Sequence, residues 1–69
     1  KKECMGIRIE KAQLQEILES LEAYPGEVDV YLKYDGKTYK APVKVRKCNG
    51  LFSELCSIVN EEDVIFFEK

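Results

Sequence analysis

The sequence contains no histidine, so no side chain has an ordinary pKa close to neutral pH. This absence argues against general acid–base catalysis by histidine and against zinc sites built from cysteine and histidine. No glycine-rich loop of the form GxGxxG, or GxxxxGK followed by Ser or Thr, is present, which argues against a nucleotide-phosphate site. No apolar run approaches the ~20 residues that a membrane-spanning helix needs.

Cysteine is sparse and odd in number, with Cys4, Cys48 and Cys56 and no CxxC pair. The pattern predicts reduced thiols in a cytoplasmic protein, with a disulfide framework as the alternative. No histidine or cluster of cations accompanies Cys56, so a catalytic nucleophile is not expected there. The acidic run at 61–63 predicts a solvated turn, because consecutive residues in a short turn do not converge on one cation. We therefore expect no catalytic, cofactor-binding or metal-binding residue.

Length and composition describe a small folded unit. Hydrophobic residues make up 45% and charged residues 35% of the chain, which predicts a globular domain rather than disorder. The 69 residues predict a single domain over 1–69, and a net charge of only −2 does not favour nucleic acid as the partner. The start KKECMGIRIE has no signal-peptide core and no initiator Met, so we expect a fragment of a longer chain.

The residues from 27 to 47, EVDVYLKYDGKTYKAPVKVRK, alternate in polarity on either side of Asp35-Gly36. Asp-Gly is a preferred pair for a two-residue type I′ turn, so this stretch predicts a β-hairpin. Pro42 has no N–H to offer a further strand, which predicts a bulge or a strand end at that position. The predicted pairs are Tyr34 with Lys37, Leu32 with Tyr39, Val30 with Ala41 and Val28 with Val43 on the apolar face, and Lys33 with Thr38, Tyr31 with Lys40 and Asp29 with Pro42 on the other.

Amphipathic helices are predicted on both sides of the hairpin. The first spans 11–24 and should end at Pro25-Gly26, where proline cannot continue the helix and glycine takes left-handed angles cheaply. The second should begin at an Asn49 N-cap and end at a left-handed Asn60. Their apolar faces follow helical spacing and consist of Leu14, Ile17, Leu18 and Leu21 in the first helix, and Leu51, Phe52, Leu55, Cys56, Ile58 and Val59 in the second.

With short strands at 4–9 and 64–67, the order is strand, helix, strand, strand, helix, strand. This order predicts an α+β fold: a ferredoxin-like βαββαβ sandwich, or split βαβ, with a four-stranded antiparallel sheet and both helices on one face. The residues expected under the helices are Ile7, Ile9, Val28, Val30, Leu32, Tyr39, Ala41, Val43, Val45, Val64 and Phe66.

The opposite, outer face of the sheet is predicted to combine basic and apolar side chains. Lysines on a sheet face are commonly just solvated and guard against edge aggregation. That explanation does not account for neighbouring large apolar residues such as Ile65 and Phe67, which favour a partner. The basic residues on this face are Arg8, Lys33, Lys40, Lys44 and Arg46. The predicted partner-binding residues are Tyr31, Lys33, Lys40, Lys44, Ile65 and Phe67.

A family resemblance rests on spaced residues between Ile7 and Phe67: Leu18, Leu21, Tyr24-Pro25-Gly26, VDVYL at 28–32, KTYKAP at 37–42, Leu51, Leu55 and Val64. This set resembles the extreme C-terminal domain of the alpha subunit of bacterial DNA polymerase III. The resemblance implies a non-catalytic domain that follows an OB-fold and helps to bind the tau subunit of the clamp loader during DNA replication. It also implies a parent DNA-directed DNA polymerase, a nucleotidyltransferase that uses magnesium and deoxynucleotides, whose catalytic aspartates lie outside this chain.

The chain departs from that family at three positions. Asn60 stands where the family commonly has glycine, and Ile65 and Phe67 stand where polar residues are more usual. These last two departures fall on the predicted partner surface. The expected partner is therefore the tau subunit, for an isolated domain that is a cytoplasmic monomer with no membrane contact.

Two other functions stay open. One is a nucleic-acid-binding sheet of the RNA-recognition type, with weak nucleic acid contact, although its aromatic-rich signature is replaced by KAPVK at 40–44. The other is a regulatory ferredoxin-like domain, for which the sequence names no pocket residues.

Overall fold

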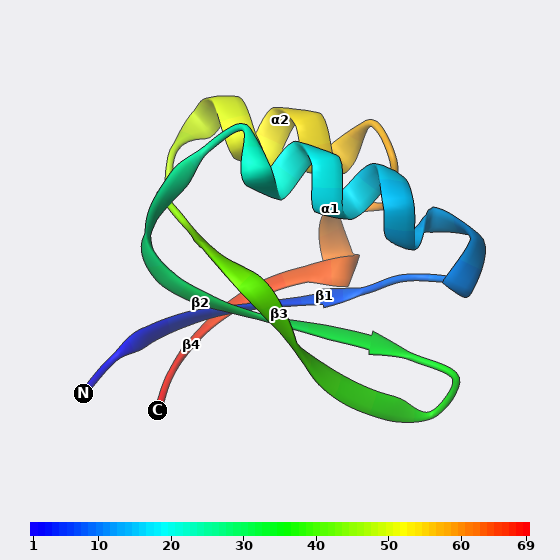
Figure 1. Cartoon of the computed structure of the whole chain (residues 1–69), viewed down its shortest axis with the longest axis horizontal. Coiled ribbons are helices and arrows are strands. Elements are labelled where there is room, and N and C mark those ends of the chain that lie inside the picture. The colour runs from blue at the N-terminus through cyan, green and yellow to red at the C-terminus, as the bar shows by residue number, and fades with distance from the viewer.

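The computed structural model, which describes residues 1–69, has the predicted α+β fold, with four strands and two helices (Figure 1). The elements are β1 (Glu3–Arg8), α1 (Leu14–Glu22), β2 (Pro25–Tyr34), β3 (Lys37–Val45), α2 (Asn49–Cys56) and β4 (Val64–Glu68), with single 3-10 turns η1 (Lys11–Gln13) and η2 (Glu61–Asp63). Both helices cover the same face of the four-stranded sheet, as the sequence predicts (Figure 1). Neither helix is long and apolar enough to cross a membrane.

The sheet is mixed, with the order β3-β2-β1-β4. β1 runs parallel to β2 and antiparallel to β4, while β2 and β3 form the hairpin. The predicted all-antiparallel, ferredoxin-like arrangement is therefore wrong, because no strand separates β1 from β2. The physical reason lies in β3, where Pro42 removes a backbone N–H and suits an edge strand better than an internal one. The regular strand β2 takes the internal position instead.

The hairpin confirms the predicted turn and corrects part of its register. Asp35 and Gly36 both have positive φ, 53° and 72°, as a type I′ turn requires. The pairing follows the prediction from the turn to Tyr31 and Lys40, and then shifts at an irregularity around Pro42. The shifted pairs are Asp29 with Lys44, instead of Pro42, and Val28 with Val45, instead of Val43. Because β3 shifts by an even number of residues, its inner and outer faces are preserved.

One apolar core joins the helices to the sheet. Most predicted core positions are buried, but Val28 and Val43 are only half-buried. Tyr39 and Phe66 are 41% and 37% exposed, so their predicted burial under the helices is wrong. The helices have nine and eight residues and therefore extend only about 12–14 Å, too short to cover the whole sheet. The core residues are Met5, Ile7, Ile9, Ile17, Leu21, Val30, Leu32, Ala41, Val45, Leu51, Leu55, Val59 and Val64.

Two aromatic residues lie where the helices do not cover the sheet, and each has a different neighbour. Tyr39 stacks on Tyr34 near the tip of the hairpin, with 4.7 Å between the ring centroids. Phe66 lies beneath the Lys47 ammonium group, which is 4.6 Å from the centre of its ring. Neither aromatic side chain is fully withdrawn from solvent.

The ends of the helices also differ from the prediction. α1 ends at Glu22, before Pro25, but Gly26 is extended within β2 rather than left-handed. Cys48, and not Asn49, is the N-cap residue of α2. Asn60 is extended, with φ −79° and ψ 154°, so its predicted left-handed conformation is wrong. Its backbone N–H donates to the Asp63 carboxylate at 3.2 Å, which starts the η2 turn.

Candidate functional site

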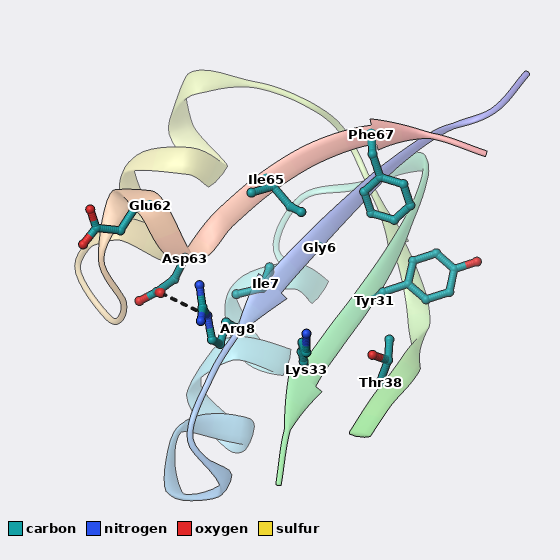
Figure 2. A pocket seen from close by; sticks show the side chains of 10 residues that line it. All are labelled: Gly6, Ile7, Arg8, Tyr31, Lys33, Thr38, Glu62, Asp63, Ile65 and Phe67. Carbon is teal, nitrogen blue, oxygen red and sulfur yellow. Dashed lines mark ion pairs between the residues drawn. The ribbon is translucent and has the colours of Figure 1, made fainter. Parts of the chain in front are cut away.

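The sheet face opposite the helices carries a hollow above the middle of β1, with a volume of about 330 Å³ (Figure 2). All four strands and η2 contribute to it. Strands that are distant in the sequence therefore bring their outward-facing side chains to one place. The lining residues are Gly6, Ile7, Arg8, Tyr31, Lys33, Thr38, Glu62, Asp63, Ile65 and Phe67.

The centre of the hollow is apolar and has Gly6 as its floor. Gly6 is the strand partner of Tyr31 on one side and of Ile65 on the other. A Cβ at Gly6 would lie 3.2 Å from Cγ1 of Ile65 and 3.3 Å from Cε1 of Phe67. Since glycine has no side chain, Tyr31 and Phe67 approach one another across β1, with ring centroids 5.9 Å apart and a tilt of 39°. Ile65 remains 56% exposed at the side of the hollow.

One end of the hollow is charged. Arg8 reaches Asp63 with Nε 3.5 Å from Oδ1, as the dashed line in Figure 2 marks. The same Asp63 carboxylate accepts the Asn60 backbone N–H, so it is held on two sides. Lys33 and Thr38 lie at the rim, and neither takes part in an ion pair. This end can therefore offer an unpaired ammonium group to a partner.

The other end of the outer face holds a buried carboxylate. Asp29 is only 5% exposed, and its oxygens lie 3.9, 3.8 and 3.6 Å from the ammonium groups of Lys2, Lys40 and Lys44. Opposite charges offset part of the cost of removing this carboxylate from water, but its Oδ1 accepts no hydrogen bond. Three ammonium groups meet one carboxylate, so the cluster stays positively charged. Cys4, the strand partner of Asp29, is buried beside it.

The structure brings together four of the six predicted partner-binding residues, since Tyr31, Lys33, Ile65 and Phe67 all line the hollow. Lys40 and Lys44 instead belong to the Asp29 cluster.

The sequence analysis did not identify three features of this face. Gly6 forms the floor of the hollow, Asp29 is surrounded by three lysines, and Asp63 pairs with Arg8. Two features of the sequence could have indicated them. A glycine within a strand, such as Gly6, often marks a place where neighbouring groups approach the backbone closely. An acidic residue among apolar strand residues, such as Asp29, needs charged or polar partners if it is buried.

The hollow combines an apolar centre with a charged rim. Nowhere do three or more His, Cys, Asp or Glu side chains gather in a way that could hold a metal ion. An apolar centre with a charged rim is instead the usual composition of a protein-binding surface.

Two groups outside the hollow have shifted pKa values. The backbone N–H of Leu51, in the first turn of α2, lowers the pKa of the Cys48 thiol, and Arg46 adds to this effect while burial opposes it. The neighbouring Glu54 carboxylate, together with burial, raises the pKa of the Tyr24 phenol. Folding therefore makes the Cys48 thiol easier to deprotonate and the Tyr24 phenol harder to deprotonate.

Cys48 should react with iodoacetamide at a lower pH in the folded protein than in the urea-unfolded chain. The thiolate is the reactive form, and folding lowers the pKa of this thiol. By linkage, Cys48 contributes stability above its unfolded pKa, and that contribution is lost as the pH falls through its folded pKa. Peptide mapping by mass spectrometry after timed alkylation measures the rate at each pH. The buried Cys4 is the internal control, since it should be labelled only after unfolding.

The same alkylation profile for Cys48 in the folded and the unfolded chain would contradict this prediction.

Comparisons with protein-family models, with curated proteins and with solved structures find no match to this chain.

Proposed function

We propose that this domain is a non-catalytic protein-docking module that binds its partner with the outer face of the sheet. The observation that carries the proposal is the hollow over Gly6, where Tyr31, Phe67 and the 56% exposed Ile65 form an apolar centre. A side chain that enters this centre leaves water and also contacts aromatic rings, the residue type that dominates binding energy at interfaces.

The electrostatics of the face support a partner whose apolar anchor is flanked by acidic residues. Lys33 lies at one end of the hollow, and the positively charged Asp29 cluster lies at the other. Charges at the rim of an interface speed association and set its orientation more than they add affinity. The partner should therefore bind faster at low salt.

The resemblance to the C-terminal domain of the DNA polymerase III alpha subunit extends this proposal to a specific partner. By that resemblance, the domain docks the tau subunit of the clamp loader in the bacterial cytoplasm, as part of a DNA polymerase whose catalytic residues lie elsewhere. Ile65 and Phe67, which replace polar residues of the family, would strengthen the apolar part of this contact.

A second candidate function is the binding of single-stranded nucleic acid. Lys69 supports it, because its ammonium group lies 4.8 Å from the centre of the Tyr31 ring and 3.2 Å from the Tyr31 hydroxyl. Bases stack on such aromatic residues, while nearby lysines contact phosphates. The rings of Tyr31 and Phe67 are, however, half-buried against one another, so they do not offer two separate surfaces on which bases could stack. The protein-docking function is therefore preferred. A regulatory domain stays a third candidate, without the ferredoxin-like fold expected for it, because the sheet is mixed.

The proposal is tested by titrating purified clamp-loader tau subunit, and separately single-stranded DNA, into isotopically labelled domain. If the partner docks on the outer face, adding the tau subunit at physiological salt should change the NMR chemical shifts of the backbone amides around Gly6, Tyr31 and Phe67. Shifts confined to Glu16, Glu19 and Glu22 would place the partner on α1 and contradict the proposal. Shifts of the outer face with DNA alone would favour the second candidate.

Charge reversal of Lys33 should slow association with the partner and reduce its dependence on salt. Lys33 is chosen because Lys44 pairs with Asp29, so reversing Lys44 would also disturb a buried carboxylate. Stopped-flow association at several salt concentrations compares Lys33→Glu with the parent chain. The matched control is Lys11→Glu, which makes the same charge change in η1 on the helix side of the molecule. Equal slowing in both variants would show that net charge, and not this face, governs association.

A further inference from the structure

β4 forms an open edge of the sheet with free backbone groups. Lys2 and Lys69 exchange both backbone hydrogen bonds, at 3.0 and 2.9 Å, which sets the alternation along the β1–β4 pair. The backbone groups of Ile65 and Phe67 consequently form hydrogen bonds with β1. The backbone N–H and C=O groups of Phe66 and Glu68 point away from the sheet. The C=O of Val64 also points outward, whereas its N–H is bonded to Glu61 within η2.

The two edges of the sheet differ in how they are protected. The other edge strand, β3, contains Pro42, a register irregularity and several lysines, all of which discourage the addition of another strand. β4 reads VIFFE and has no proline or lysine within it. An unprotected apolar edge favours strand pairing.

Apolar side chains flank this edge on both faces of the sheet. Ile65 is 56% exposed on the outer face, and Phe66 is 37% exposed on the face that the helices cover. A partner that lies over one face would bury only one of them. A strand that lies beside β4 would bury both and would also satisfy the free backbone groups.

We propose that β4 pairs antiparallel with β4 of a second copy of this chain, about a two-fold axis at Phe66. In this register Phe66 faces Phe66 of the other copy, Ile65 faces Phe67, and Asp63 faces Lys69. The Phe66 residues exchange two hydrogen bonds, and each Glu68 N–H donates to the Val64 C=O opposite. A shift by two residues that moved the axis to Ile65 would lose the hydrogen bonds from Glu68, because its partner position would then lie in η2 rather than in β4.

This pairing goes beyond the proposed docking function, because it uses the edge of the sheet and leaves the outer face open. In Figure 2, Ile65 and Phe67 project from β4 over that face, at the side of the hollow. Pairing at the β4 edge would set the hollows of two copies side by side. A partner with two anchors would then bind across the two-fold axis. A dimer formed in this way would replace the monomer that the sequence analysis expects.

Sedimentation velocity over a wide range of protein concentration tests the proposal, with a reversible dimer as the expected result. Glu68→Pro removes an outward N–H that is not used by β1 and should raise the dimer dissociation constant about tenfold or more, because the bond occurs twice. Glu68→Ala is the matched control and should leave the dimer intact. A chain that sediments as a monomer at every concentration would overturn the proposal.

A charge reversal checks the register independently. Lys69→Glu places like charges opposite Asp63 at both ends of the paired strands and should weaken the dimer. Lys1→Glu, which makes the same charge change outside β4, is the matched control and should not. If a dimer is present but neither Lys69→Glu nor Glu68→Pro weakens it, the interface lies elsewhere on the molecule.

Discussion

Gly26→Ala should lose about 3 kcal/mol or more of its free energy of unfolding, a large part of the stability of so small a domain. A Cβ at this position would lie 2.5 Å from the Arg46 nitrogen and 2.5 Å from the Val45 carbonyl oxygen. Both are backbone atoms, so no change of side-chain rotamer relieves the contact. The Arg46 N–H also donates to the Tyr24 carbonyl at 2.8 Å, which holds that backbone in place. Urea unfolding followed by circular dichroism measures the loss.

Gly36→Ala is the matched control for this experiment. Gly36 has φ 72° in the turn, but no atom lies within 4 Å of the position a Cβ would occupy. Its substitution should cost only about 1–2 kcal/mol of left-handed strain. Equal destabilisation by the two substitutions would show that the close approach of β2 to β3 at Gly26 is not a constraint.

Phe67→Ala should weaken binding of the proposed partner by about 1–3 kcal/mol, which is roughly a fivefold to hundredfold increase in Kd. The Phe67 ring packs against Tyr31 over Gly6, where a docked anchor would contact it. The variant should stay folded, because Phe67 lies outside the core that the helices cover. Isothermal titration of the tau subunit into each variant measures the difference.

Tyr39→Ala provides the control, since it also removes an exposed aromatic ring. Tyr39 lies on the opposite face, where it stacks on Tyr34 near the tip of the hairpin. Its removal should leave the Kd unchanged within about twofold, the spread of ordinary surface substitutions. An effect of Tyr39→Ala as large as that of Phe67→Ala would move the docking surface to the helix side.

The candidate site shows where prediction from the sequence succeeds and where it stops. Alternation within β2 and β4 correctly assigned Tyr31, Ile65 and Phe67 to one face, because side-chain direction in a strand follows a period of two residues. It did not distinguish Lys33, which lines the hollow, from Lys44, which pairs with Asp29. That difference depends on the register shift near Pro42, which moved Lys44 opposite Asp29.

By itself, the sequence determined the features that local geometry controls: the Asp35-Gly36 turn, the apolar stripes of the two helices and the two faces of each strand. Tertiary structure alone decided the strand order, the exposure of Phe66 and the meeting of Tyr31 with Phe67 over Gly6. These features depend on which strands become neighbours and on how far two short helices reach across the sheet. Both are set by packing between residues far apart in the chain, which no local period encodes.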